Sequence, residues 1–241
     1  MTSQNISVLK SSDEIREAFI LHIREAIFSS DSNKKNYDLN SLHHSEIYKN
    51  LRLKKGTDQS TLFHKAVYST FDQSNYFESK FWKNYRKLCL NVVQKLKDEK
   101  GYFGEWAIQR FPTIRFQFPE NISVFEFHRD SDYCHPISEI NCFYAVNECL
   151  ESSALHVEKN LGFEDYFPLN LKSGEYAILN TSIFKHGDFL NRTGKTRVSM
   201  DFRFIPKKHL NNEKSSLTKG IKFNSDSYFI DEKEMDRMKI N

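Results

Sequence analysis

The chain has 241 residues and a formal net charge of +3, from 35 Lys and Arg against 32 Asp and Glu. This length suffices for one domain with a substantial core, and the mixed charge without a dense basic block argues against nucleic acid as a partner. The polar N-terminus lacks the order of a signal peptide and no stretch reaches the length of a membrane span, so we expect a soluble, cytoplasmic protein with no membrane partner.

Two amphipathic helices are predicted in the first hundred residues. Residues 13–28 place apolar side chains at helical spacing, and Ser12 or Asp13 can cap the start. Residues 77–98 repeat the pattern, and Gly101 is expected to end that helix. The stretch between the two helices is polar and rich in Asn and Lys, and we interpret it as a connector.

From residue 105 the sequence changes to short runs of β-branched and aromatic residues separated by Pro, Asn and Gly, which is typical of strands. Their number and spacing favour a closed or double-sheet β core flanked by the helices. We predict one domain over 1–241, with a helical part at 1–104, the β core at 105–206, and a charged extension or lid at 207–241. A partly disordered tail is the alternative for the last part. The predicted strands are 105–111, 113–118, 122–127, 139–146, 153–158, 175–180 and 196–206.

Two imidazoles and one carboxylate in the β region have the spacing of a metal site. Residues two apart on an extended chain project to the same side, so His128 and Asp130 can reach one ion while Arg129 points away. The third ligand must come from another strand, and His186 fits because SIFKHGD reads as a short strand that runs into a Gly turn. Such a set leaves open positions on an octahedral ion, and Fe(II) is the redox-capable choice. We therefore predict His128, Asp130 and His186 as the metal ligands and catalytic residues.

The letters HRD at 128–130 also open the catalytic loop of protein kinases. No Leu follows Asp130, His135 stands where the kinase asparagine would be, and the sequence has neither a GxGxxG loop nor a DFG motif. We therefore reject the kinase interpretation.

A chance HxD match is the plain alternative in a chain with nine histidines. The order of the motifs, HxD, then His186, then an Arg on the next strand, argues against chance.

The last predicted strand alternates, and its polar side carries Arg197, Ser199, Asp201 and Arg203. A guanidinium matches a carboxylate in a bidentate fork, and a hydroxyl two residues further can add a donor on the same side. We predict that Arg197 with Ser199 holds the distal carboxylate of 2-oxoglutarate, whose 2-oxo acid end would chelate the iron. The alternative is a solvated strand face, which is our interpretation of Asp201, Arg203 and Lys195.

Together these motifs resemble a known enzyme family. They look like the Fe(II)/2-oxoglutarate-dependent oxygenases, and within them the small-molecule hydroxylases similar to the streptomycin-biosynthesis hydroxylase-like group. The resemblance implies a mostly β fold with flanking α-helices and a double-stranded β-helix core of the jelly-roll, cupin-like kind. It implies Fe(II) on His128, Asp130 and His186, with 2-oxoglutarate on Arg197 and O₂ as the second cosubstrate. The segments that carry the resemblance are HRD at 128–130, EIN at 139–141, FKHGD at 184–188 and NRTGKTRVSMDFRFIP at 191–206.

The resemblance also implies the reaction, which is hydroxylation of a small polar molecule coupled to decarboxylation of 2-oxoglutarate to succinate. Asp130 argues against halogenation, because related halogenases have a small residue there, whereas desaturation and ring closure stay open. Asp188 departs mildly from the family, which often has Asn after His-Gly.

The alternative function is a non-catalytic or differently metallated cupin-type barrel, such as a sensor, isomerase or hydrolase. Arg197 argues against it, because such proteins need no clamp for a dicarboxylate.

Polar residues on the strands that flank the HxD motif are the candidates for substrate contacts. A buried polar side chain needs a partner, and a cation with an anion suits an amino acid or another zwitterion. We predict Arg115, Gln117 and Glu139 as substrate contacts, and Asn141 as a contact to the cosubstrate or the substrate. Structural salt bridges or a solvent-facing sheet side are the alternatives. The oligomeric state stays open, and a homodimer is compatible with the sequence.

Overall fold

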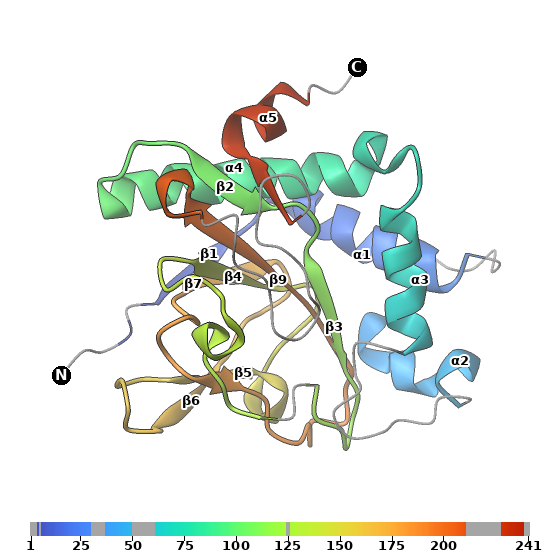
Figure 1. Cartoon of the computed structure of the whole chain (residues 1–241). Coiled ribbons are helices and arrows are strands. Elements are labelled where there is room, and N and C mark those ends of the chain that lie inside the picture. Colours follow the sequence, from blue (N-terminus) through green and yellow to red (C-terminus); the bar gives the residue numbers. More distant parts are fainter. Residues whose placement is uncertain are drawn as a thin grey trace.

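The chain folds into a layer of helices, a large antiparallel sheet and a small antiparallel sheet (Figure 1). The computed structural model describes residues 4, 6–29, 37–49, 61–123, 126–210 and 228–238. The α-helices are α1 (Asp13–Ile27), α2 (Glu46–Lys49), α3 (Leu62–Phe71), α4 (Lys80–Lys100) and α5 (Glu232–Arg237). Short 3₁₀ helices are η2 (Leu39–His44), η4 (Tyr76–Glu78), η5 (Asp130–Tyr133), η6 (Glu151–Ser153) and η7 (Lys207–His209).

The large sheet is built around β9, its longest strand. Its order is β1, β7, β4, β9, β2, β10, and β3 also pairs with β9. One edge of β9 pairs with β4, and the other edge pairs first with β3 and then with β2. In the small sheet β5 lies between β6 and β8. The strands are β1 (Ser7–Lys10), β2 (Trp106–Gln109), β3 (Thr113–Gln117), β4 (Ile140–Ala145), β5 (Leu155–Glu158), β6 (Tyr166–Leu169), β7 (Glu175–Leu179), β8 (His186–Gly187), β9 (Arg197–Pro206) and β10 (Phe229–Asp231).

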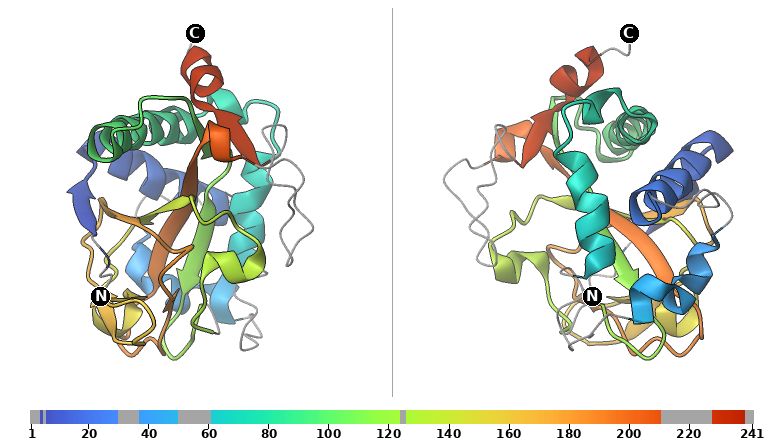
Figure 2. Two further views of the ribbon diagram at one scale, coloured as in Figure 1. Left: turned by 60° about the vertical axis from the view of Figure 1, so that its left-hand side comes forward. Right: turned by 90° about the vertical axis from the view of Figure 1, so that its right-hand side faces the viewer.

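The helices cover one face of the large sheet. The right-hand view of Figure 2 shows α1 and α4 on the same side of β9. The apolar side of β9, including Met200 and Phe202, shares one core cluster with Phe19 of α1 and Tyr85 of α4. The rings of Tyr85 and Phe202 meet edge-on, with centroids 5.1 Å apart. The apolar half of the predicted alternation in β9 therefore packs against the helical layer.

The opposite face of the large sheet carries the polar side of β9 and looks toward the small sheet. Phe143 of β4 and Ala177 of β7 belong to a second buried cluster with Leu155 and Val157 of β5. Apolar packing between the sheets is thus confined to part of their area. The polar side chains of β9 fill the rest, and nearly all candidate site residues lie there.

Both predicted long helices are confirmed, together with the predicted cap at Ser12 and the predicted end at Gly101, whereas the second helix starts three residues later than predicted. The Ser12 side chain accepts a hydrogen bond from the backbone N–H of Ile15 at the start of α1. Ser79 caps α4 in the same way, so that this helix begins at Lys80. Gly101 ends α4 with φ of 63°, a left-handed conformation that glycine adopts without steric cost. Within the described ranges, no helix has both the length and the apolar character needed to cross a bilayer.

Among the described elements, three strands and three α-helices are absent from the sequence prediction, namely β1, β6, β10, α2, α3 and α5. The helix α3 lies in the stretch that we interpret as a connector, where Thr61 caps it and Phe63 and Val67 are buried. The strand predicted at 122–127 is wrong for the described part of that range, which forms no strand. Only His128, just beyond it, makes a β-bridge, to His186.

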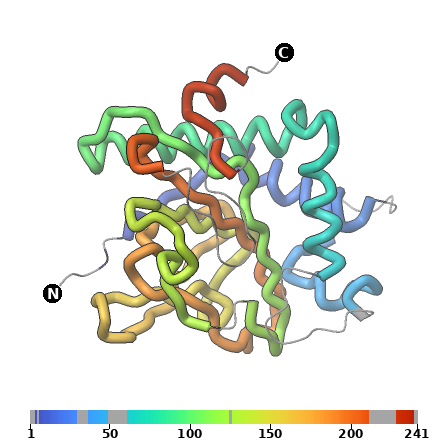
Figure 3. The backbone as a smooth tube through the Cα atoms, viewed as in Figure 1, coloured from blue at the N-terminus to red at the C-terminus, as the bar shows by residue number. Residues whose placement is uncertain are grey.

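The described end of the chain is built into the large sheet. Residues 228–238 form β10, which pairs with β2, and α5, which packs on α4. Nε of Arg86 in α4 donates to the carbonyl of Met235 at 2.6 Å. Figure 3 traces this segment in red, beside the green trace of α4. Residues 211–227 and 239–241 of the predicted extension lie outside the described residues.

Candidate metal centre

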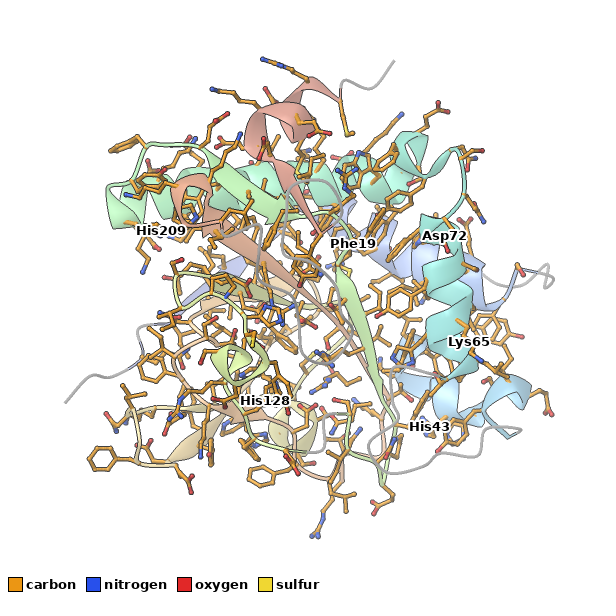
Figure 4. All side chains as sticks on the ribbon, in the orientation of Figure 1. Phe19, His43, Lys65, Asp72, His128 and His209 are labelled. Atoms are coloured by element: carbon orange, nitrogen blue, oxygen red, sulfur yellow. The ribbon has the colours of Figure 1, made fainter. Side chains whose placement is uncertain are left out.

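The three predicted ligands lie together. His128 and His186 donate their backbone N–H groups to each other's carbonyls, at 3.1 and 2.9 Å, so their rings are neighbours. Arg129 is extended, with φ of −99° and ψ of 144°, which brings Asp130 back to the side of His128. Asp130 Oδ1 lies 3.9 Å from Nε2 of His128 and 3.8 Å from Nε2 of His186. The ligand atoms all lie within 4.8 Å of one another, and Figure 4 labels His128 in the sheet half of the molecule, away from Phe19 in the helical layer.

The imidazoles present the nitrogens that a metal needs. Nδ1 of His128 lies 2.9 Å from the carbonyl of Glu126, which can only accept, so Nδ1 is the donor there and Nε2 is the nitrogen that faces Asp130. Burial lowers the pKa of His186 to about 4, so this ring is neutral at pH 7. A neutral imidazole binds a metal without first losing a proton. The donor set therefore fits a divalent ion.

Asp130 is held in place by two partners. Thr181 Oγ1 donates to its Oδ2 at 2.6 Å, and Nη2 of Arg203 lies 3.3 Å from both carboxylate oxygens. Burial by itself raises the pKa of Asp130, but the positive charge of Arg203 in particular holds that pKa well below its usual range. Asp130 is therefore an ionised carboxylate in a fixed position, as its predicted role as a ligand requires.

Arg203 stands at the centre of a buried cluster of charges. Its Nε lies 2.9 Å from Glu139 Oε1 and its Nη1 lies 3.4 Å from Asp201 Oδ2. Nη1 also donates to the hydroxyl of Tyr228 at 3.2 Å. Only 7% of Arg203 and 4% of Asp201 is exposed, so their interpretation as a solvated strand face is wrong. The side of β9 that carries them faces the interior, whereas Lys195, before the strand, is exposed as expected.

Arg197 already has a carboxylate partner. Its Nη1 and Nη2 donate to Oδ1 and Oδ2 of Asp188 at 2.7 and 3.0 Å, and both side chains are fully buried. The same nitrogens donate to the carbonyl of Ser153 and the hydroxyl of Ser123. Nε of Arg197 and the hydroxyl of Ser199 are buried with no hydrogen-bond partner among the described residues. The role of Arg197 and Ser199 in holding 2-oxoglutarate stays a prediction, and the fork that it needs is taken by Asp188.

The four residues predicted for the substrate cavity lie on the interior side of the large sheet. Arg115 donates from Nε to Asp201 at 2.8 Å, and Glu139 pairs with Arg203, so both take part in the salt bridges of the alternative interpretation. The three residues other than Arg115 each have a side-chain oxygen without a hydrogen-bond partner among the described residues. Oε1 of Gln117, Oε2 of Glu139 and Oδ1 of Asn141 are buried acceptors with no hydrogen-bond partner in the described part of the chain. Their contact with a substrate stays a prediction.

Comparisons with known proteins find similarity in sequence to one protein and in fold to solved enzymes. No family model matches the chain. The streptomycin biosynthesis protein StrG from Streptomyces griseus is 29% identical over 174 residues, which are 72% of this chain and 77% of StrG. The non-heme monooxygenase ThoJ, solved as a nickel complex, is 8% identical, with 89% of this chain and 80% of ThoJ covered and a TM-score of 0.50. The non-heme alpha ketoglutarate dependent carbocyclase SnoK from nogalamycin biosynthesis is 7% identical, with 84% and 80% covered and a TM-score of 0.50.

The chain shares the fold of these two solved enzymes. At 7 to 8% identity the structural likeness concerns the fold and not the substrate. The sequence match to StrG relates the chain to a protein of streptomycin biosynthesis.

Sequence reasoning missed the residues that hold the predicted ones in place. Thr181, Ser123 and Tyr228 carry no signal in the sequence, because their partners are 51 to 74 residues away or, for Tyr228, on the interior strand β9. Asp188 stood out only as a departure from a motif. The signal available in the sequence was its position two residues after His186. On an extended segment this position puts the carboxylate on the same side as His186, toward Arg197.

Protein freed of metal by a chelator is expected to lose stability as the pH falls from about 6.5 to about 4. Burial lowers the pKa of His186 to about 4, so within this window the unfolded chain binds a proton at His186 that the folded chain does not. A lower pH therefore favours unfolding, and the free energy of unfolding falls by about 3 kcal/mol between pH 6.5 and pH 4. Urea unfolding at several pH values measures this slope, which should be shallower in His186→Asn.

His22 of α1 contributes to the slope that remains in the variant, as does His156, whose pKa burial also lowers. His22 is largely buried, and burial lowers its pKa to about 4 as well. If the free energy of unfolding depends on pH equally in the wild type and in His186→Asn, His186 is not neutral in the folded protein.

Proposed function

We propose that the chain is an Fe(II)/2-oxoglutarate-dependent dioxygenase that hydroxylates a small polar molecule. The observation that carries the proposal is the buried group of His128, Asp130 and His186, whose ligand atoms lie within 4.8 Å of one another. Two imidazoles and one carboxylate suit a divalent transition metal with open positions, and Fe(II) is the redox-capable choice. Bound iron with 2-oxoglutarate would supply activation of O₂, coupled to decarboxylation of the 2-oxo acid to succinate.

The protein's own part in this chemistry is to position and shield the ligands. Exposed fractions of the side chains are 4% for Asp130, 11% for His186 and 17% for His128. Access to an ion is therefore from the side of His128, where Tyr133 stands edge-on with its ring centroid 5.1 Å away. Thr181 and Arg203 keep the carboxylate of Asp130 in the ligand set, and an occupied carboxylate position disfavours a halide there.

We also infer that the two sheets are the halves of a double-stranded β-helix. Three observations support this: all strand pairings in the described residues are antiparallel, the polar side of β9 lies between the sheets, and ThoJ and SnoK share the fold. One core cluster takes in α1, α4, β9 and β10, which supports a single domain over the whole chain.

The substrate is proposed to be a small zwitterion or a polar biosynthetic intermediate. Arg115 and Glu139 put opposite charges on the interior side of the sheet, and Asn141 and Gln117 add acceptors that lack partners among the described residues. Buried acceptors of this kind are satisfied when a ligand brings donors. StrG is named as a biosynthesis protein and SnoK as a carbocyclase, which supports a small-molecule substrate and keeps ring closure as an alternative to hydroxylation.

A second candidate is a barrel of the same fold that uses another metal or none, as a sensor, isomerase or hydrolase. The observation that favours it is the bidentate pair of Asp188 and Arg197. A guanidinium with a carboxylate of its own is not free to hold the distal end of 2-oxoglutarate.

Anaerobic titration distinguishes the two candidates. Fe(II) is added to the purified protein under nitrogen, metal binding is measured directly, and 2-oxoglutarate is then added. We expect a weak visible charge-transfer band, because a 2-oxo acid chelates iron through its carboxylate and keto oxygens. Iron that binds without the band would leave the metal centre standing, overturn the cosubstrate assignment and favour the second candidate.

A further inference from the structure

The ion pair between Asp188 and Arg197 lies where the proposed function requires an available guanidinium. We propose that Asp188 is an internal competitor for the distal carboxylate of the 2-oxo diacid, and that it lowers the affinity of the protein for that cosubstrate. The inference rests on the proposed function. It makes Asp188 a residue that sets selectivity between dicarboxylic and monocarboxylic 2-oxo acids.

A count of donors supports the competition. A guanidinium has five N–H donors, and in Arg197 four of them are in use. Two go to Asp188, one to the carbonyl of Ser153 and one to the hydroxyl of Ser123. The donor that remains is Nε–H, which has no partner among the described residues. A second carboxylate can therefore take a single bond from Arg197, and two-point binding requires Asp188 to leave.

The electrostatics point the same way. Burial raises the pKa of Asp188, but the charge of Arg197 and the hydrogen bonds from Arg197 and Ser123 together outweigh burial and lower that pKa below its ordinary value, so Asp188 is ionised. Its negative charge neutralises Arg197 at a site with no exposure to solvent. An incoming carboxylate would meet a like charge in surroundings that screen it poorly. Removal of the charge of Asp188 should therefore favour a dianionic ligand.

Ser123 and the close packing at Gly187 hold Asp188 beside Arg197. Ser123 donates to Asp188 and accepts from Arg197, so it ties the two together. Gly187, which precedes Asp188, is packed so closely that a Cβ there would lie 3.0 Å from the ring of Phe127. Release of Arg197 by Asp188 would therefore also break the hydrogen bond that Ser123 donates to Asp188.

The test compares two ligands on the Fe(II)-loaded protein without oxygen. One ligand is 2-oxoglutarate, and the other is 2-oxopentanoate, which has the same chain length and no distal carboxylate. Affinities are measured by titration of the charge-transfer band and by calorimetry. We expect Asp188→Asn to bind 2-oxoglutarate at least about tenfold more tightly than the wild type, because a full charge-assisted pair becomes available. The affinity for 2-oxopentanoate should stay unchanged.

Asp201→Asn is the matched control, because Asp201 is also buried and pairs with the arginines Arg115 and Arg203 on the same side of the sheet. A dicarboxylate-specific gain in Asp201→Asn and not in Asp188→Asn would make Arg115 the anchor and overturn the proposal. An equal gain for both ligands in Asp188→Asn would overturn it too, because the effect would not depend on the distal carboxylate.

Ser123→Ala keeps the proposal testable if Asp188→Asn does not fold. This variant loosens the pair without leaving a buried charge alone, and we expect a smaller gain that is again specific to 2-oxoglutarate. An unchanged ratio of the two affinities in Ser123→Ala would count against the competition. If iron binds and neither 2-oxo acid gives the band in any variant, the proposed function itself fails and the inference falls with it.

Discussion

Replacement of His186 by alanine is expected to abolish metal binding and turnover. His186 supplies one of three ligand atoms, and its buried ring is one of two imidazoles whose backbones are bonded to each other. Loss of a group that only orients a ligand typically costs about 10–100-fold in metal affinity, so loss of a ligand itself should cost more than about 100-fold. Calorimetric titration with Fe(II) under nitrogen measures this loss, and succinate release in air measures turnover.

His156→Ala is the control for this experiment. His156 is also a buried histidine, with 7% exposure, and it lies opposite Gly187 in the small sheet. Its Nδ1 is bonded to the carbonyl of Ala154, and it is outside the ligand group. We expect His156→Ala to keep metal binding. Equal metal affinity in His186→Ala and the wild type would show that the ligand set is assigned to the wrong residues.

The grouping of His128, Asp130 and His186 could be predicted from the sequence because its geometry is mostly local. In HRD, the first and third side chains lie on the same side whenever the backbone is extended, and Arg129 is extended as this requires. His186 needed one further assumption, that its short strand lies beside His128. The β-bridge between the two residues confirms that assumption.

The surroundings of the ligands could not be predicted, because alternation gives the side of a strand and not what covers that side. Asp201 and Arg203 follow the predicted alternation, yet they are buried under the residues of other segments, including Tyr228. The same limit applies to Arg197, whose position was predicted and whose partner Asp188 was not. Pairing between buried charges depends on the whole tertiary structure, since each partner comes from a different segment.

Missed strands have a related cause. β1 and β10 are short and owe their extended form to pairing with β7 and β2. The opposite error occurred at 122–127, where an alternating apolar pattern predicts a strand. There Ser123 turns its hydroxyl to Arg197, and the ring of Phe127 packs on Tyr166 with centroids 4.0 Å apart. Side-chain contacts, and not a partner strand, fix the described part of this segment.

Replacement of Arg203 by methionine should destabilise the protein by about 3–5 kcal/mol, the usual result when one partner of a buried ion pair is removed. Methionine has a similar length but no charge, so Asp130, Glu139 and Asp201 lose the cation that they share. Urea unfolding of the metal-free protein at pH 7 measures the loss. Lys195→Met is the control, because Lys195 pairs with Glu148 at the surface, where ion pairs contribute little.

If Arg203 only supports the fold, its replacement changes stability alone. If it also positions Asp130, its replacement changes how metal binding depends on pH as well. Burial raises the pKa of Asp130, and the charge of Arg203 is the main opposing influence. Without Arg203 the carboxyl keeps its proton to higher pH, and a protonated carboxyl does not bind Fe(II). The pH at which half of the metal affinity is lost should therefore rise in Arg203→Met and move back toward the wild-type value in Arg203→Lys. A loss of stability with an unmoved pH profile would show that Arg203 supports the fold without tuning the ligand.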